Sequence, residues 1–218
     1  MHGALLSTVR TSQVERVHAG QAPVAYTVWV PATGKRARTT RDKLTLIESL
    51  RAISEGKMYV EVERARLTKK LASMHEAKGE KEKARKLMQD TTVETLGGME
   101  RREKTEFILE QIRLNLETED FVRAHITAKK IQVKVFKDAE LEDLKMRYYT
   151  MIVRYHQHSQ NWMEIFRAYQ AMFNSPSMAI DEAAAHRCVK LQTLYLLPSP
   201  FDNEQSESMH ALSAAQTL

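Results

Sequence analysis

The side chains best suited to hold a metal ion are His156 and His158 in "YHQHSQ". Imidazole nitrogens are common zinc ligands, but a structural or catalytic zinc needs three or four protein ligands that converge on one point. Alternate residues on a helix point to different faces. No cysteine or carboxylate cluster in this stretch completes a coordination shell. We therefore interpret both histidines as ordinary helix residues and predict no metal ligands.

Two other groups have the residue types for catalysis. Glu61 and Glu63 in "YVEVERARL" could form an acid–base pair, but the same alternation separates them, and Glu63 is better interpreted as a partner for nearby basic side chains on a solvated face. Cys188 is the single cysteine, so no internal disulfide framework is possible. We interpret it as a small buried helix residue, with an active thiol as the alternative.

A short basic run, "GKRART", has the composition of a phosphate-binding or nucleic-acid-binding segment. It lacks the second glycine and the Lys-Ser/Thr ending of a phosphate-binding loop. In a polar segment such a run is more often solvated charge. From the residues alone we expect no catalytic residue, no cofactor-binding residue and no cofactor.

Net charge divides the chain into two parts. The formal charge is +5, and residues 1–41 hold six basic residues against one acidic residue, whereas the rest of the chain is balanced. Residues 1–41 are therefore predicted to form a divergent, flexible, basic leader, in which "AYTVWV" at 25–30 is the one possible strand. A basic adaptor that binds nucleic acid through this leader is one functional alternative.

The elements that position all these residues are predicted to be helices. Prolines occur only at 23, 31, 176, 198 and 200, and the few glycines between them mark turns. Apolar residues recur at three- and four-residue steps in the intervening stretches, as in "TEFILEQIRLNLE". The predicted helices cover residues 43–54, 58–77, 80–90, 99–117, 120–131, 140–157, 161–174 and 179–197.

Small residues on either side of a glycine predict a helical hairpin. Ala72 and Ala84 flank a turn at Gly79 and allow two helices to cross closely. Their spacing is that of a degenerate tetratricopeptide repeat. Ala124 and Ile165 occupy the place of Ala84 about forty and eighty residues later. We predict an all-α protein, a right-handed α-solenoid of degenerate tetratricopeptide-like hairpins, in preference to an irregular bundle.

An aromatic-rich helix pair follows in the third repeat. Its rings pack in the predicted core, although a groove for a partner peptide is the alternative. The residues are Tyr148, Tyr149, Tyr155, Trp162, Phe166, Tyr169 and Phe173.

Longer stretches of sequence resemble a known family. The run from "EGKMYVEVERARL" through "VETLGGMERREKTEFILEQIRL" to "HITAKKI", and the later "LKMRYYTMIVRYHQHSQNW" and "LLPSPFDNEQSESMH", resemble PCI-family subunits of the lid of the 26S proteasome. The resemblance covers about residues 42–210. It implies helical repeats leading into a PCI module, which ends in a winged helix, and a non-enzymatic scaffold role in ubiquitin-dependent protein degradation.

The resemblance also sets expectations for organisation and partners. Residues 42–197 are expected to be the repeat solenoid, and residues 198–218 the start of a PCI region truncated before the winged helix. Expected partners are other proteasome lid subunits in a hetero-oligomer, in the cytoplasm and nucleus, with no direct contact to nucleic acid. No apolar run is long enough to span a membrane, so no membrane contact is expected. A scaffold like signalosome subunit 4, which shares this plan, is the other alternative.

Overall fold

The computed structural model describes residues 40–93 and 96–216 of the 218-residue chain. The regular elements in these ranges are all helical, without a strand, which confirms the all-α prediction. The α-helices are α1 (Thr40–Ile53), α2 (Glu61–Glu76), α3 (Lys81–Gln89), α4 (Arg101–Glu117), α5 (Phe121–Ala128), α6 (Glu142–His158), α7 (Trp162–Phe173), α8 (Pro176–Ile180), α9 (Glu182–Leu196) and α10 (Asn203–Gln216). Three short 3-10 helices are η1 (Met58–Val60), η2 (Val133–Lys137) and η3 (Ala139–Leu141). The possible strand at 25–30 and nearly all of the expected leader lie outside the described residues.

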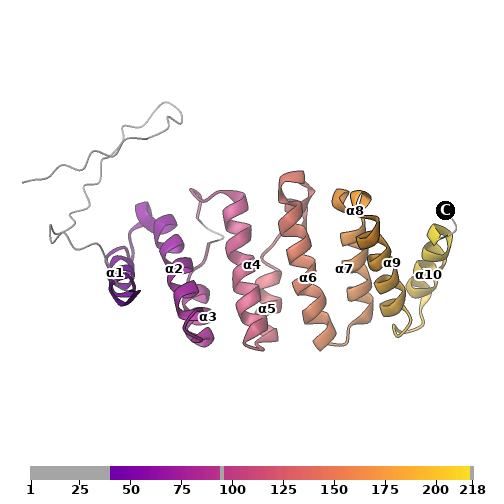
Figure 1. Cartoon of the computed structure of the whole chain (residues 1–218), viewed down its shortest axis with the longest axis horizontal. Helices are drawn as coiled ribbons and strands as arrows, with labels where there is room; N and C mark the ends of the chain where they lie inside the picture. Colours follow the sequence, from indigo (N-terminus) through magenta and orange to yellow (C-terminus); the bar gives the residue numbers. More distant parts are fainter. Residues whose placement is uncertain (1–39, 94–95, 217–218) are drawn as a thin grey trace, which may run out of the picture. The chain divides into compact units, whose positions relative to one another are not determined.

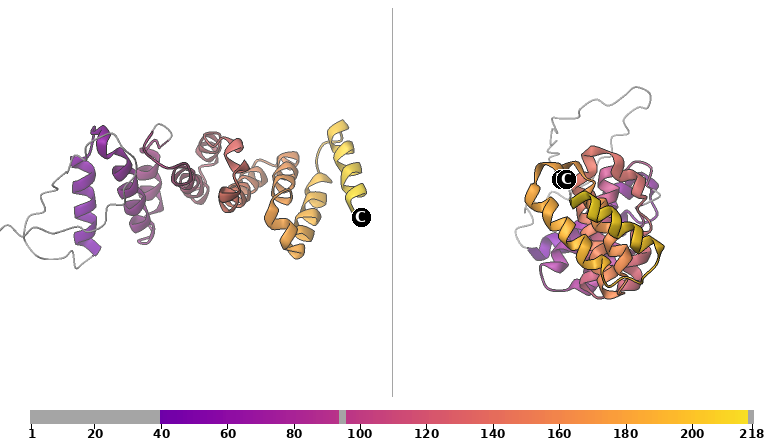
Figure 2. Two further views of the ribbon diagram at one scale, coloured as in Figure 1. Left: turned by 90° about the horizontal axis from the view of Figure 1, so that it is seen from above. Right: turned by 90° about the vertical axis from the view of Figure 1, so that its right-hand side faces the viewer.

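The α-helices contact their neighbours in the chain. α2 packs on α3, α4 on α5, and α6 on α7, which gives three antiparallel hairpins. α4 also contacts α3 and α6, so each hairpin is joined to the next. α9 packs on α7, and α10 packs on α9. Figures 1 and 2 show these helices following one another in chain order. The described part of the chain is therefore a helical-repeat solenoid, as predicted.

One turn geometry closes all three hairpins. Each turn contains one residue with a positive φ, which is 82° at Gly79, 59° at Glu119 and 54° at Gln160. The N–H of the residue that follows donates a hydrogen bond to the carbonyl five residues before it. These bonds run from Glu80 to His75 (2.9 Å), from Asp120 to Asn115 (2.8 Å) and from Asn161 to His156 (3.0 Å). This bond is the 6→1 bond of a Schellman motif, which satisfies a carbonyl at the helix end. The recurrence of the turn confirms the repeat spacing.

The predicted repeat positions are buried. Ala84, Ala124 and Ile165 lie on the second helices of the three hairpins, and each is at most 1% exposed. Ala72 on α2 is 3% exposed and belongs to the same apolar cluster as Ala84. Small side chains at these places let two helices approach closely. The hairpin predicted around Gly79 is therefore confirmed.

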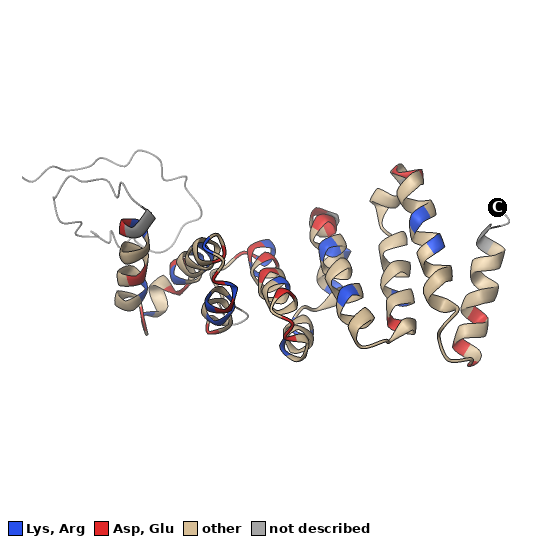
Figure 3. Cartoon of the chain, turned by 60° about the horizontal axis from the view of Figure 1, so that its bottom comes forward, with Lys and Arg blue, Asp and Glu red and all other residues tan. Residues whose placement is uncertain are grey.

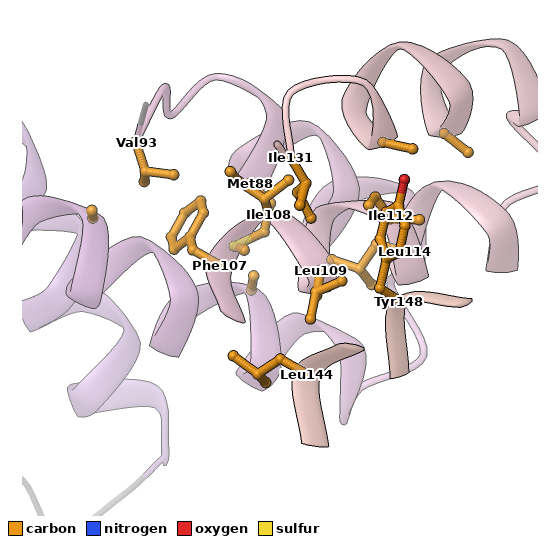
Figure 4. Packing of buried hydrophobic residues seen from close by; sticks show 14 of the residues in the cluster. Met88, Val93, Phe107, Ile108, Leu109, Ile112, Leu114, Ile131, Leu144 and Tyr148 are labelled. Atoms are coloured by element: carbon orange, nitrogen blue, oxygen red, sulfur yellow. The ribbon is translucent and has the colours of Figure 1, made fainter. Parts of the chain in front are cut away.

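The largest apolar cluster is centred on α4. Phe107, Leu109 and Ile112 of this helix are each at most 2% exposed. Figure 4 shows them among Met88 of α3 and Leu144 of α6. Because α4 is covered by α3, α5 and α6, it buries apolar residues on most of its circumference. The packing of α3, α5 and α6 on α4 therefore determines where the surfaces of these three helices lie.

The C-terminal helices differ from the expected ones. The helix predicted over 179–197 is divided into α8 and α9 by Asp181, whose side chain accepts a hydrogen bond from the N–H of Ala184 (3.0 Å). α10 was not expected as a helix. Asp202 precedes it and accepts from the N–H of Gln205 (2.7 Å), which is an N-cap interaction. The prolines at 198 and 200 end α9 but leave a new helix free to begin at 203.

Candidate protein-interaction site

One face of α4 carries charged side chains at steps of three and four residues. This charged stripe consists of Glu103, Glu106, Glu110, Arg113 and Glu117. Its members reach across to α2. Glu103 accepts two hydrogen bonds from Arg66 (2.7 and 2.8 Å), and Arg113 donates two to Glu76 (2.7 Å each). Figure 3 shows acidic and basic residues interspersed along these helices.

The charged stripe also connects α4 to the following hairpin. Glu110 accepts a hydrogen bond from Arg147 of α6 at 2.7 Å while it pairs with Arg113 on its own helix. Burial alone would raise the pKa of Glu110, but Arg113 and Arg147 together hold it below its ordinary value. The carboxylate is therefore ionised at neutral pH. Side chains of three successive repeats form one ion-pair network, which fixes how the hairpins stack.

A cavity of about 200 Å³ lies between α3 and α5, and α4 contributes to its lining. We call it the α3–α5 cavity. Its lining contains three basic and four uncharged polar side chains and one apolar one: Arg85, Gln89, Gln111, Asn115, Arg123, Ile126, Thr127 and Lys130. No carboxylate belongs to the lining. Glu82 and Asp120 lie beside the lining, however, and pair with Arg85 and Arg123, so the charge of these arginines is offset.

The inner wall of the α3–α5 cavity is fixed by hydrogen bonds. Arg85, whose side chain is 9% exposed, donates to Glu82 (2.9 Å) and to Asp120 (3.2 Å). Gln111 donates to the carbonyls of Met88 (2.6 Å) and Thr91 (3.0 Å), which holds the end of α3. These donors are already engaged. Hydrogen bonds within the protein therefore hold this wall in place.

Asn115 lies at the buried side of the same cavity. It is 2% exposed, and its amide nitrogen is 3.5 Å from the hydroxyl of Thr127. Its amide oxygen has no hydrogen-bond partner among the described residues. A buried acceptor without a donor costs free energy, so such atoms are uncommon in folded proteins. Arg123 and Lys130 are exposed at the outer side of the cavity.

A second cavity of about 290 Å³ lies between α5, α6 and α7. Its lining includes two tyrosine and two histidine rings, and one of the latter, His125, stacks on the neighbouring Tyr155 at 4.9 Å between centroids. Burial lowers the pKa values of His125 and His156, with Lys129 adding to the effect at His125. Nδ1 of His156 has no partner among the described residues. Both imidazoles are thus neutral at pH 7, although the lining also contains the charged side chains of Lys129, Glu164 and Arg167.

The structure places the two candidate metal ligands in different surroundings. His158 stacks on Phe121 with ring centroids 3.6 Å apart, whereas His156 contacts Tyr155 edge to face. Within residues 40–93 and 96–216 no three His, Cys, Asp or Glu side chains are grouped to hold a metal ion. Glu63 lies 3.9 Å from Arg66 on its own helix, the pairing expected for a solvated face.

The remaining candidates are packing residues. Cys188 is buried, and burial raises the pKa of its thiol. In the aromatic-rich pair of helices, Tyr148 and Phe166 are buried, as the core interpretation requires, but the interpretation is wrong for Phe173, which is 38% exposed at the end of α7. Trp162 and Tyr169 both stack against Tyr195 of α9, at 6.1 and 5.8 Å between centroids. Tyr195 was not among the aromatic residues singled out in the sequence.

Several large apolar side chains are exposed. Val122 and Ile126 lie one turn apart on α5 and are 72% and 56% exposed. Phe201, before α10, is 90% exposed. Contiguous apolar patches mark interaction surfaces, whereas single exposed apolar residues are common on folded proteins, so the adjacent pair Val122 and Ile126 is the better candidate contact. Within the described ranges, no helix has the length and apolar character that a membrane span requires.

Comparison with known proteins gives this surface a context. Residues 21–181 match the family model described as "PSMD12/CSN4, N-terminal". The chain is 40% identical over 170 residues to the 26S proteasome non-ATPase regulatory subunit 12 of Dictyostelium discoideum, which covers 78% of this chain and 38% of that protein. It is 33% identical over 176 residues to the 26S proteasome regulatory subunit RPN5 of Saccharomyces cerevisiae, which covers 81% of this chain and 40% of that protein.

A plant relative gives the same result. The 26S proteasome non-ATPase regulatory subunit 12 homolog A of Arabidopsis thaliana is 38% identical over 192 residues, which covers 78% of this chain and 43% of that protein. The chain therefore spans about two fifths of the length of these relatives. The resemblance to proteasome regulatory subunits that the sequence indicated is confirmed.

Proposed function

The chain belongs to the PSMD12/CSN4 N-terminal family, and from this we infer that it acts as a non-catalytic scaffold subunit of the lid of the 26S proteasome regulatory particle. The observation that carries the proposal is the identity of 33–40% to proteins named 26S proteasome regulatory subunits, over about four fifths of this chain. In this role the chain supports ubiquitin-dependent protein degradation by holding other lid subunits in place.

The described helices suit such a role. Stacked hairpins present a long row of side chains to neighbouring subunits without needing a catalytic centre. Ion pairs between α2, α4 and α6 keep that row rigid, and exposed residues such as Val122 and Phe201 offer apolar contacts. The balanced charge of residues 42–218 favours selective protein contacts over general attraction to polyanions. The expected partners are other lid subunits in a hetero-oligomer.

The organisation and location follow from the same proposal. Residues 42–197 are the repeat solenoid, residues 198–218 begin a PCI region, and residues 1–41 form a basic leader. The protein works in the cytoplasm and nucleus, where proteasomes act. The second candidate is a scaffold like signalosome subunit 4, because the matching family model takes in both kinds of subunit. A nucleic-acid adaptor acting through the leader is a weaker third candidate, supported by the leader's charge alone.

Affinity purification of the tagged chain tests the proposal. Proteasome lid subunits are the proteins expected to be recovered with the chain. Their recovery should not fall when the salt concentration is raised moderately, because salt screens charged groups and does not weaken apolar contacts. A matched chain that starts at residue 42 should recover the same proteins. Recovery of signalosome subunits alone would transfer the chain to the second candidate. Binding of nucleic acid that disappears with residues 1–41 and falls steeply with salt would support the adaptor instead.

A further inference from the structure

We propose that the cavity between α5, α6 and α7 binds an aromatic side chain of a partner protein, while acidic neighbours of that side chain contact lysines at one edge of the cavity. We call it the α5–α7 cavity. The inference rests on the proposed scaffold function and deepens it, since it names a site on the scaffold and the chemistry of the segment that binds there. Three observations carry it: the size of the cavity, the rings in its lining, and the unequal charge of its two edges.

The α5–α7 cavity is large enough for one inserted side chain. It measures about 290 Å³, just below the range of about 300–1,000 Å³ that is usual for sites of free small molecules. Figure 1 shows α5, α6 and α7 next to one another in the row of helices. Val133, which belongs to the lining, is 53% exposed, so a partner can reach the cavity at this residue. Buried anchor residues of this kind carry much of the binding energy of protein interfaces.

The rings of the lining favour an aromatic anchor. Tyr148 and Tyr149 of α6 and His125 of α5 all belong to the lining. Burial raises the pKa values of both tyrosines and lowers that of His125, so the three rings are uncharged at pH 7. Aromatic rings pack with their centroids about 4.5–7 Å apart, which adds to the free energy gained from burial alone. An aromatic side chain therefore gains contacts here that an aliphatic one does not.

One edge of the cavity carries positive charge that no ion pair offsets. Lys129 and Val133 belong to the lining, and Lys134 follows Val133 in the chain. Both lysines are exposed, and neither makes an ion pair with another residue that the structure describes. The charge of Lys129 also lowers the pKa of His125, which places it close to the rings. We call Lys129, Val133 and Lys134 the lysine edge, and its two cations are free to contact carboxylates of a partner.

The edge formed by α7 has the opposite charge. Glu164 and Arg167 belong to the lining and pair with each other. Arg167 also donates a hydrogen bond to Glu204 of α10 (3.0 Å), so two carboxylates share one guanidinium. This edge therefore offers no free cation and repels a carboxylate. The acidic residues of a bound segment must lie along the lysine edge alone.

The unequal charge of the two edges favours a peptide over a nucleic acid. A single-stranded nucleic acid can stack a base on aromatic rings and place a phosphate on lysines. Its backbone carries a phosphate on both sides of every base, however, and one of them would face Glu164 and Glu204. A peptide can place acidic residues on one side of its aromatic residue and uncharged residues on the other. The arrangement of charge is therefore complementary to such a peptide segment.

Fluorescence anisotropy with two defined probes tests the inference. Each probe is a fluorescein-labelled peptide of about nine residues with one phenylalanine, about four glutamates and otherwise glycine and serine. The glutamates precede the phenylalanine in one probe and follow it in the other, because either chain direction can bring them to the lysine edge. At least one probe should bind the full chain with a Kd below about 0.1 mM. Failure of both probes to bind would overturn the inference.

Reversing the charge of the lysine edge tests where the glutamates bind. Lys129→Glu/Lys134→Glu should weaken binding of the tighter probe by about tenfold or more. Lys57→Glu/Lys78→Glu is the matched control, since it changes the net charge equally at exposed positions near the two ends of α2, and it should leave Kd within about twofold. The control keeps residues 1–41, so it also accounts for general attraction of an acidic probe to their basic side chains. Equal weakening in the two double variants would overturn the inference.

The aromatic anchor has tests of its own. A probe with serine in place of phenylalanine should bind about tenfold more weakly. Val133→Asp places a carboxylate in the lining and should weaken binding, whereas Val122→Asp, on α5 outside the lining, should not. In the unchanged protein, the NMR signal of the Cε1–H of His125 should shift with the phenylalanine probe and not with the serine probe, because a ring current acts only at short range.

Two results would contradict the choice of ligand. Equal binding of the phenylalanine and serine probes would show that no aromatic anchor enters the cavity. A single-stranded oligonucleotide that binds through Lys129 and Lys134 more tightly than both peptides would show that the site takes a nucleic acid. Either result would overturn the inference.

The outcome is separable from that of the proposed function. If the tagged chain recovers lid subunits but neither probe binds, the scaffold function stands and the cavity inference is wrong. If a probe binds through Lys129 and Lys134 but lid subunits are not recovered, the site stands and its partner lies in another assembly. Circular dichroism of each variant shows whether the helices are retained, so that a loss of folding is not counted as a loss of binding.

Discussion

Arg113 of α4 donates two parallel hydrogen bonds of 2.7 Å to Glu76 of α2, from Nη1 to Oε1 and from Nη2 to Oε2. Their side chains are 25% and 27% exposed, so water screens the pair only in part. Arg113 also contacts Glu110 and Glu117, and Glu110 in turn contacts Arg147 of α6. Arg113 is therefore the junction at which three successive hairpins are joined by charge.

Removing this junction should destabilise the fold. Arg113→Ala leaves three partly buried carboxylates near one another, and we expect the free energy of unfolding to fall by about 1–3 kcal/mol, between the values for surface and buried ion pairs. Urea unfolding followed by circular dichroism measures the change. Arg154→Ala, which removes an exposed arginine from α6, is the control and should change stability by less than about 0.5 kcal/mol. Equal stability of the two variants would show that the network contributes nothing.

Ala84 marks the close crossing of α2 and α3. Ala84→Trp should destabilise the protein by about 1–3 kcal/mol or more, because Ala84 is 0% exposed and a large ring has no space at the crossing. Thermal unfolding is the measurement. Ala77→Trp adds the same ring to an exposed position of the same hairpin and should have little effect. An unchanged unfolding temperature for Ala84→Trp would contradict the packing of this hairpin.

Glu80 makes the first hairpin sensitive to acid. Hydrogen bonds from Lys83 (2.9 Å) and from His75 (2.7 Å) lower the pKa of Glu80 from 4.5 to about 2. Because the pKa is lower in the folded state, the unfolded state binds more protons in this range. The stability contributed by Glu80 is therefore fully present above pH 4.5 and is lost as the pH falls toward 2.

The expected result is a reduced acid response on removing this carboxylate. Glu80→Gln should lose less stability than the unchanged protein when the pH is lowered from about 5 to about 3, measured as the midpoint of urea unfolding. Glu207→Gln, which removes an exposed carboxylate from α10, should leave the acid response as it was. A response to acid that is the same in Glu80→Gln as in the unchanged protein would contradict the assigned role of Glu80.

Much of the fold was predictable because its signals are local. Apolar residues at helical spacing and the sparse glycines and prolines gave the helices within a few residues. The positions of Ala84, Ala124 and Ile165 gave the repeat, and all three are buried. The start of α10 was missed because its signal is a single capping residue, Asp202, within a stretch that also contains prolines. A capping residue followed three residues later by Glu or Gln, here Asp202 and Gln205, is a pattern that sequence analysis can use.

The candidate site was much less predictable, because its residues come from three helices. Arg85, Asn115 and Lys130 meet in the α3–α5 cavity although no motif connects them. Their meeting depends on how two hairpins pack, which spacing within one helix does not reveal. The charged stripe of α4 did have a signal, since its residues recur at steps of three and four. Its partners on α2 lie about one repeat away, at Arg66 and Glu76.

The three Schellman turns have different residues at the position with positive φ, and this difference predicts how substitutions there change stability. Gly79 adopts its positive φ without steric cost, whereas Glu119 and Gln160 hold side chains in the same left-handed region. Glu119→Gly and Gln160→Gly should therefore each raise the free energy of unfolding by about 0.5–1 kcal/mol, and Gly79→Ala should lower it by a similar amount. Lys129→Gly is the control, because Lys129 ends α5 with an ordinary right-handed φ of −64°. It should destabilise the protein, since glycine there only adds freedom to the unfolded chain. Urea unfolding of the four variants measures the signs, and destabilisation by glycine at both 119 and 160 would show that their side chains contribute more than their backbone strain costs.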